Sequence, residues 1–499
     1  MLSDLALGFS VALSLNNLAL CFLGCMIGTL IGVLPGIGPI ATISILLPFT
    51  FGISPVGSMI MLAGIYYGAQ YGGSTTAILV RMPGEAGSIV TIIDGHAMAR
   101  NGRAGAALAL AALGSFFAGT VATFVIGAFA APLGKIAYLL GSEDYFALIV
   151  LGLVFAVVLA GGSVLKAVIS ILIGVILASV GTDVETGAQR LTFGIPSLFE
   201  GINVSLLAMG IFGVGEILRN LEDREVKPFI QTAIGRLWPS REEIRRSVGP
   251  VLRGTFLGSL LGVLPGSGTL LAPFASYVLE KKIAKEPERF GQGAPEGVAG
   301  PEAANNAASQ TCFIPLMSLG LPPNAVMALM LGALTIQGIT PGPQVFTKYP
   351  ELFWGMVASM WIGNLMLLVI NLPLIGLWVS LLRVPYRLLY PAILLFCCIG
   401  LFSVNQQPVD IYFMAGLGIV GIVMFKLGLE APPMLLGFVL GDSLEANFRR
   451  TLIFADGDWT AFVRSPVAVI LLIAALVVLA FTLVPTIRRR RDEILKEED

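Results

Sequence analysis

Two polar segments interrupt an otherwise apolar chain, and their side chains are the ones best suited to bind a small charged ligand. The first, YGGSTT, spans residues 71–76, and the second, PEAANNAASQT, spans residues 301–311. Hydroxyls and amides that are buried in an apolar environment need hydrogen-bond partners. They either bond between helices or hold a ligand or ion, and we favour the ligand or ion.

The candidate residues in and beside these segments fall into two groups. A carboxylate embedded in a membrane is costly and usually functional. Glu302 therefore ligates a cation, carries a proton or caps the helix that follows, and the sequence leaves these three interpretations open. The candidates for substrate binding are Ser74, Thr75, Thr76, Asn305 and Asn306, and those for ion coupling are Gln70, Glu302, Asn305 and Ser309.

A glycine-rich sequence that occurs twice is expected to position these residues. Residues 23–38 read LGCMIGTLIGVLPGIG and residues 253–268 read RGTFLGSLLGVLPGSG, so the core GVLPG repeats at an offset of 230. Each copy predicts a helix with glycine at every fourth position, which is then interrupted by a Pro-Gly pair. Interrupted hydrophobic segments at corresponding positions of two halves indicate the binding site of a transporter.

The interruptions add backbone groups to the candidate site. A broken helix exposes N–H groups at the start of one half-helix and C=O groups at the end of the other. The N–H end suits a carboxylate and the C=O end suits Na⁺. We therefore add to the substrate-binding candidates Pro35, Gly36, Gly38, Pro265, Gly266, Ser267, Gly268 and Thr269. With one histidine and cysteines in apolar surroundings, we expect no cofactor and no metal beyond Na⁺.

The repeats also extend beyond the glycine-rich copies. Gly64, Gly68 and Gly72 align with Ala299, Ala303 and Ala307 at an offset of 235. Small residues four positions apart let helix backbones pack closely in lipid. This register aligns Gln70 with Asn305, Ser74 with Ser309 and Thr76 with Thr311.

Composition sets the fold class. The 499 residues are 56% hydrophobic and 12% charged, which excludes a soluble globular domain. A net charge of −1 gives no sign of a nucleic-acid partner. Counting apolar runs of about 20 residues predicts roughly 11 to 13 membrane-embedded segments. We expect an all-α polytopic membrane protein that contains two inverted-topology repeats, each with a Pro-Gly-broken re-entrant hairpin.

The charges divide the chain and orient it. Residues 1–218 form the first half, with a hairpin around 17–50, and 254–487 the second, with a hairpin around 254–280. The arginine-rich linker 219–253 and the tail 488–499 are expected in the cytoplasm, where basic segments remain. Basic residues flank the second hairpin but not the first, and the uncharged segment 318–343 should lie outside. An alternative interpretation makes the basic clusters lipid- or nucleotide-binding patches.

Six blocks follow one another along the chain: GVLPGIGP, YYGAQYGGSTTAIL, DGHAMARNGRAG, EGVAGPEAANNAA, GITPGP and GDSLEANFRR. Together they resemble one family, the large membrane subunit of tripartite tricarboxylate transporters. The resemblance implies a multi-pass importer of carboxylates such as citrate in the bacterial inner membrane, driven by an ion gradient that is usually sodium. It also implies two partners, an extracytoplasmic solute-binding protein and a small four-helix membrane subunit.

Other functions remain to be weighed against this one. A self-sufficient carboxylate symporter that needs no binding protein is the main alternative, and a channel is another. We expect no enzyme, since the chain has no H-E-x-x-H, no G-x-S-x-G and no ATP-binding phosphate loop. We expect alternating access, and a homodimer is one possible assembly.

Overall fold

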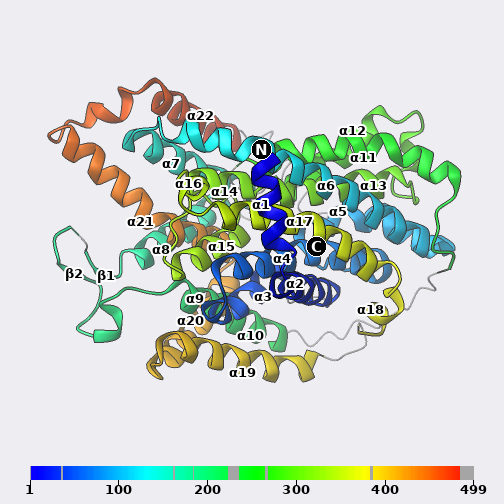
Figure 1. Ribbon diagram of the computed structural model, residues 1–499. Coiled ribbons are helices and arrows are strands. Elements are labelled where there is room, and N and C mark those ends of the chain that lie inside the picture. The colour runs from blue at the N-terminus through cyan, green and yellow to red at the C-terminus, as the bar shows by residue number, and fades with distance from the viewer. Residues whose placement is uncertain are drawn as a thin grey trace.

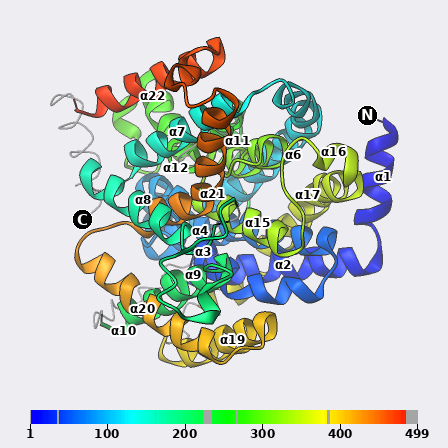
Figure 2. The ribbon, with the colours of Figure 1, turned by 90° about the vertical axis from the view of Figure 1, so that its left-hand side faces the viewer.

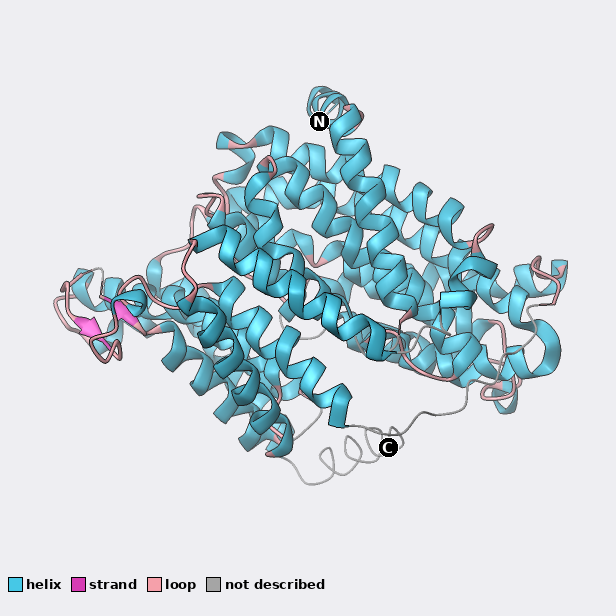
Figure 3. Cartoon of the chain, turned by 90° about the horizontal axis from the view of Figure 1, so that it is seen from below, coloured by secondary structure: helices cyan, strands magenta, loops and turns pink. Residues whose placement is uncertain are grey.

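The computed structural model describes residues 2–34, 38–160, 163–183, 185–222, 235–381 and 386–483. Helices make up nearly all of it, and a single short antiparallel pair, β1 (Gly181–Thr182) with β2 (Gln189–Arg190), is present in the described residues. Figure 3 shows this pair at the edge of the helical body. The prediction of an all-α protein is therefore confirmed.

Five described helical stretches are long and apolar enough to cross a membrane, which makes the protein polytopic. They are α2 (Leu15–Val33), Ala99–Ala137 with α6 (Ala104–Ala137), Val204–Glu222, α17 (Pro350–Asn371) and α20 (Val409–Lys426). Shorter apolar helices accompany them, among them α8 (Val164–Ala178) and α22 (Pro466–Leu483). The number of embedded segments, roughly 11 to 13 by the length rule, stays a prediction.

The remaining helices connect or surround these spans (Figures 1 and 2). Segments η3, η4 and η6 are π-helical. The bounds are α1 (Leu2–Ala12), α3 (Gly38–Leu46), η1 (Leu47–Gly52), α4 (Pro55–Val80), η2 (Ala86–Ser88), α5 (Ile89–Thr91), η3 (Ile92–His96), η4 (Ala99–Arg103), α7 (Ser142–Leu159), η5 (Pro196–Leu198), α9 (Val204–Ala208), η6 (Met209–Val214), α10 (Gly215–Glu222), α11 (Arg241–Gly262), α12 (Gly268–Ile283), η7 (Pro287–Arg289), α13 (Glu296–Thr311), α14 (Phe313–Leu319), α15 (Ala325–Ile336), α16 (Val345–Lys348), α18 (Ile375–Leu381), α19 (Tyr386–Asn405), α21 (Ala431–Phe454) and η8 (Trp459–Val463).

Helices α2 and α4 touch along their backbones, because glycine leaves room for the contact. A Cβ atom added at Gly28 would lie 2.3 Å from the carbonyl oxygen of Ile65. One turn on, a Cβ at Gly32 would lie 2.4 Å from the oxygen of Ala69. No real side chain fits at such distances, so the glycine spacing of α2 sets how deeply it packs against α4.

Helices α11 and α13 repeat this contact in the second half. A Cβ at Gly258 would lie 2.2 Å from the carbonyl oxygen of Ala304, and one at Gly262 would lie 2.4 Å from that of Ala308. Ile65 and Ala69 therefore correspond to Ala304 and Ala308, an offset of 239. The predicted offset of 235 is wrong by one helical turn, because small residues every fourth position fit equally well in either register.

Both glycine-rich helices end before the Pro-Gly pairs. Helix α2 ends at Val33, and α3 begins at Gly38, whose φ is +63°. In the second copy, α12 folds back onto α11, since a Cβ at Gly268 would lie 2.0 Å from the carbonyl oxygen of Leu261. The chain thus reverses at the second interruption. That the two halves have opposite topology stays a prediction.

Asp94 joins the two halves at one end of the bundle. This buried carboxylate, in η3, accepts hydrogen bonds from the backbone N–H groups of Gly291, Gly293 and Ala294 and from the hydroxyl of Tyr277 in α12. These four bonds tie η3 to α12 and to the segment that precedes α13. Nearby, Arg246 holds Glu296 by two bonds of 2.6 and 2.9 Å, and Arg253 holds Glu280 by two of 2.8 and 2.7 Å.

A second ionic cluster fastens the β pair to α21. Arg449 contacts Asp183 at 3.0 Å and Glu445 at 2.6 Å, and Arg190 contacts Glu445 at 2.7 Å. The backbone N–H of Glu185 also donates to Asp183. This N–H bond and the Arg449 guanidinium lower the pKa of Asp183 to about 2.

We predict that Gly28→Ala destabilises the protein, because its methyl group would collide with the backbone oxygen of Ile65. Overpacking of this kind costs about 1–3 kcal/mol. Melting temperature and yield of monodisperse protein in detergent measure the effect. The matched control is Gly416→Ala in α20, where nothing lies within 4 Å of the added Cβ. Equal stability of both variants would contradict the packing described for α2.

We also predict that Asp183 stabilises the fold in a pH-dependent way. Its folded-state pKa of about 2 lies below the usual value, so the ionised form favours the folded state. Asp183→Asn should therefore lower the melting temperature above pH ~4. The difference from the unmodified protein should shrink as the pH falls from about 4 towards about 2. A difference independent of pH over that range would argue against the ion pair.

Candidate functional site

The buried carboxylate of Glu302 connects helices from both halves. Its side chain is fully buried within α13, at 0% exposure. Ser74 of α4 donates a hydrogen bond of 2.6 Å to one carboxylate oxygen, and Thr91 of α5 donates to the other. The interpretation of Glu302 as a helix cap is wrong, because its carboxylate bonds across to the first half and α13 begins six residues earlier.

Asn305, one turn along α13, extends this network. Its amide nitrogen lies 2.9 Å from the side-chain amide of Gln70 and donates to Glu85 Oε1 at 2.8 Å. With the Gln70 amide turned to satisfy its neighbours, its oxygen accepts from Ser309 at 3.3 Å. Gln70 of α4 and Ser309 of α13, which this hydrogen bond joins, are equivalent positions of the two halves when α4 and α13 are aligned at the offset of 239.

The polar network therefore contains all four predicted ion-coupling residues, of which Asn305 is also a predicted substrate residue, together with the predicted substrate residue Ser74 and two residues that were missed. Glu85 follows α4 in a loop, where its Oε2 accepts from the Gly87 N–H at 2.8 Å. Sequence reasoning missed Glu85 because a carboxylate in a Pro-Gly loop is typical of a solvated turn. It missed Thr91 because the residue lies in an apolar stretch. The polar network consists of Gln70, Ser74, Glu85, Thr91, Glu302, Asn305 and Ser309.

The electrostatics of the polar network are unbalanced. Neither Glu85 nor Glu302 has an ion-pair partner within the described part of the chain. Burying a carboxylate without an opposite charge costs much more than burying a hydroxyl. The network therefore suits a state in which a proton or a bound cation offsets its negative charge.

Three predicted substrate residues make other contacts. Thr76 donates to the carbonyl oxygen of Val33 at 2.9 Å and so satisfies the last turn of α2. Asn306 donates to Ser115 of α6 at 2.6 Å, away from Asn305. Thr75 lines a small pocket that shares Ser74 with the polar network.

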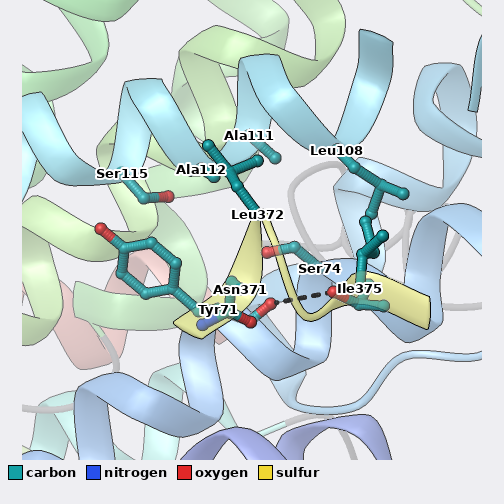
Figure 4. A pocket seen from close by; sticks show the side chains of 10 residues that line it. Tyr71, Ser74, Leu108, Ala111, Ala112, Ser115, Asn371, Leu372 and Ile375 are labelled. Carbon is teal, nitrogen blue, oxygen red and sulfur yellow. Dashed lines mark hydrogen bonds between the residues drawn. The ribbon is translucent and has the colours of Figure 1, made fainter. Parts of the chain in front are cut away.

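This pocket lies between α4, α6 and the corner where α17 meets α18 (Figure 4). Tyr71, Ser74 and Thr75 line one side, and Ser115 and Asn371 contribute polar groups from the others. Its volume of about 10 Å³ leaves room for about one water molecule. The Asn371 side-chain oxygen has no hydrogen-bond partner among the described residues. A pocket this small with oxygen atoms in its wall could hold a hard cation but not a carboxylate.

The remaining predicted substrate residues belong to the two Pro-Gly interruptions. Pro35, Gly36, Pro265, Gly266 and Ser267 lie outside the described residues. Gly38 and Gly268 are the first residues of α3 and α12, and Thr269 follows in the first turn of α12. Helix α12 packs against η2, the turn that follows Glu85, so the second hairpin approaches the polar network.

Apolar spans that enclose Glu302, a fully buried carboxylate without an ion-pair partner in the described residues, define the class of this molecule, a polytopic membrane transport protein. The chain belongs to the tripartite tricarboxylate transporter TctA family, whose model matches residues 18–436. It is therefore a membrane permease of a system with other subunits, and its family is one of transporters and not of enzymes.

Two relatives come from Agrobacterium vitis. One, described as an uncharacterized 52.8 kDa protein in the TAR-I ttuC' 3' region, is 56% identical over 499 residues, covering 100% of this chain and 99% of the relative. The other, an uncharacterized protein in the TAR-II ttuC' 3' region, is 57% identical over 242 residues, covering 48% of this chain and all of the relative. No solved structure matches the chain significantly.

We predict that Asn305→Ala abolishes uptake while the protein still reaches the membrane. The change removes the Asn305 donor to Glu85, and a hydrogen bond to a charged group contributes about 1.5–3 kcal/mol. Uptake into vesicles and the amount of protein in the membrane measure the two effects. Asn101→Ala, which removes an exposed bond to the backbone of Gln292, is the control. Normal uptake by Asn305→Ala would refute the assignment of the polar network.

Proposed function

We propose that this chain is the permease subunit of a binding-protein-dependent secondary importer that couples carboxylate entry to a cation, preferably Na⁺. The observation that carries the proposal is the pair of carboxylates, Glu85 and Glu302, in a polar network without a basic partner among the described residues. These carboxylates repel an anionic substrate for as long as they are charged and unpaired.

Cation binding would remove this repulsion. A Na⁺ ion beside Glu85 and Glu302 lowers the negative potential at the polar network, so the anion then binds more tightly. Linkage requires the converse as well, so that bound substrate strengthens cation binding by the same factor. Coupling of cation and anion thus follows from the charges of the network.

The substrate itself would be held by groups that donate hydrogen bonds. The first turns of α3 and α12 offer free backbone N–H groups, and helix N-termini favour carboxylates. Thr269 lies in the first turn of α12, which contacts α13, the helix that carries the Asn305 amide. Helix α3 contacts α4, which carries the Gln70 amide. Citrate and related organic carboxylates are the substrate class we propose, transported by alternating access of the two halves.

The partners we propose follow from the tripartite family. A solute-binding protein would deliver the carboxylate at the outer face of the bacterial inner membrane, and a small membrane subunit would accompany this one. A homodimer is compatible with this arrangement. The C-terminal tail, which lies outside the described residues, would be cytoplasmic. A carboxylate symporter that works without a binding protein is the alternative.

The test is uptake of labelled citrate, malate, succinate and fumarate into membrane vesicles that carry the chain with its small subunit. Uptake that needs both a Na⁺ gradient and the binding protein is the expected result. Uptake without the binding protein would favour the self-sufficient symporter, and uptake driven by a pH gradient alone would assign the coupling to protons. Absence of uptake of every carboxylate would overturn the proposal.

One substitution tests the role of the carboxylates. We expect Glu302→Gln to lower Na⁺-driven uptake at least about tenfold, which corresponds to about 1.4 kcal/mol of coupling. The amide keeps the size of the side chain and its contact with Ser74 but removes the charge that attracts the cation. Initial rates of uptake against Na⁺ concentration measure the change.

The control for this substitution is Glu286→Gln, which removes an exposed carboxylate paired with Arg289 at the surface. It should leave the Na⁺ dependence unchanged. Unaltered Na⁺ dependence in Glu302→Gln would show that this carboxylate has no part in coupling.

A further inference from the structure

A large cavity lies apart from the polar network, at the end of the molecule that carries the β pair. It has a volume of about 810 Å³, within the range of small-molecule sites. Its walls come from the start of α7, the start of α9, the end of α15 and the middle of α21. Figure 2 shows α9, α15 and α21 side by side in this region.

Two sequence blocks with no part in the polar network meet at this cavity. The block GITPGP, residues 338–343, supplies Thr340 and two prolines to the wall. The block GDSLEANFRR, residues 441–450, supplies Ser443, Asn447 and Arg450. These blocks are about a hundred residues apart in the chain, and both consist largely of residues that a lipid-facing helix would not need.

The side chains of α21 form a polar stripe on the cavity wall. Ser443, Asn447 and Arg450 are spaced four and then three residues apart, so they share one face of the helix. Asn447 donates to the carbonyl oxygen of Ser443 at 2.8 Å, which leaves its second N–H and its oxygen for another partner.

Arg450 differs from its neighbour Arg449. Arg449 is held by Asp183 and Glu445 in the cluster that fastens the β pair. Arg450 is exposed and has no ion pair or hydrogen bond within the described ranges. A guanidinium that is not needed for the fold and lines a cavity is suited to bind a carboxylate by two parallel hydrogen bonds.

The opposite wall adds donors of the same kind. Asn203 uses its side-chain oxygen to accept from the Ser205 N–H at 2.8 Å, so its amide nitrogen remains for a ligand. Asp442 also lines the cavity. It precedes Arg450 by eight residues, about 12 Å along the helix, so a carboxylate held by Arg450 stays clear of it.

From these contacts we infer that the cavity is an outer binding site for a carboxylate anion, with Arg450 as its cationic anchor. The inference rests on the proposed function, since a carboxylate importer needs an entry site before the polar network. The cavity wall at residues 319–321 leads to Asn324, which donates to the hydroxyl of Tyr66 at 3.4 Å. Tyr66 lies one turn before Gln70 on α4, so this chain of contacts connects the cavity wall to the polar network.

The first test of the outer site is chemical protection of a cysteine placed in it. Ser443→Cys should react with a negatively charged thiol reagent in the purified complex of permease and small subunit. Citrate, malate, succinate or fumarate should slow the reaction, and the carboxylates that protect should be those taken up. Arg450→Gln in the same background should raise the concentration needed for protection about 10- to 100-fold, as expected for a lost charge-assisted hydrogen bond. Arg450→Lys should restore part of the protection.

The control is Arg464→Gln, which removes an exposed arginine outside the cavity. It should leave protection unchanged. Equal protection with and without Arg450 would overturn the outer site. Vesicle uptake by the unmodified protein separates the two proposals: uptake that persists while no carboxylate protects the cysteine rejects only the outer site, whereas a lack of both rejects the proposed function as well.

Discussion

A carboxylate buried between two helices of a membrane protein constrains everything around it. Glu302 has no exposed surface, and its two oxygens are taken by hydroxyls of α4 and α5 and not by a basic side chain. Hydroxyls reduce the cost of burying the charge but cannot cancel it. Glu85 adds a second carboxylate within reach of Asn305. The polar network therefore suits a state that holds a proton or a cation, and we propose that this preference links the fold to transport.

The glycine stripes explain how such a network can exist between closely packed helices. In α2 and α11, glycine brings each helix into backbone contact with its partner, α4 or α13. Close contact on one face of α4 and α13 leaves their other faces to meet each other through Gln70, Ser74, Glu302 and Asn305. Asp94 then joins the two halves at one end, and the ion pairs of Arg246 and Arg253 tie α11 to α13 and to α12.

The sequence alone predicted much of this arrangement and missed part of it for identifiable reasons. The helical class follows from composition, and Gln70, Ser74, Glu302, Asn305 and Ser309 were recognisable because polar residues are rare in apolar helices. The predicted alignment of the α4 sequence with the α13 sequence was wrong by one helical turn, since small residues recur at every fourth position in both. Glu85 could not be found, because only the fold shows that its loop turns inwards.

The balance of charge in the polar network can be tested without a transport assay. The measurement is the melting temperature of the purified complex in Na⁺ and in choline, for the unmodified protein and for Glu85→Gln and Glu302→Gln. An ion that binds the folded state alone stabilises it. We predict that Na⁺ raises the melting temperature of the unmodified protein and has little effect on the two variants. Equal responses of all three proteins, or no response to Na⁺ or to pH in any of them, would contradict the account.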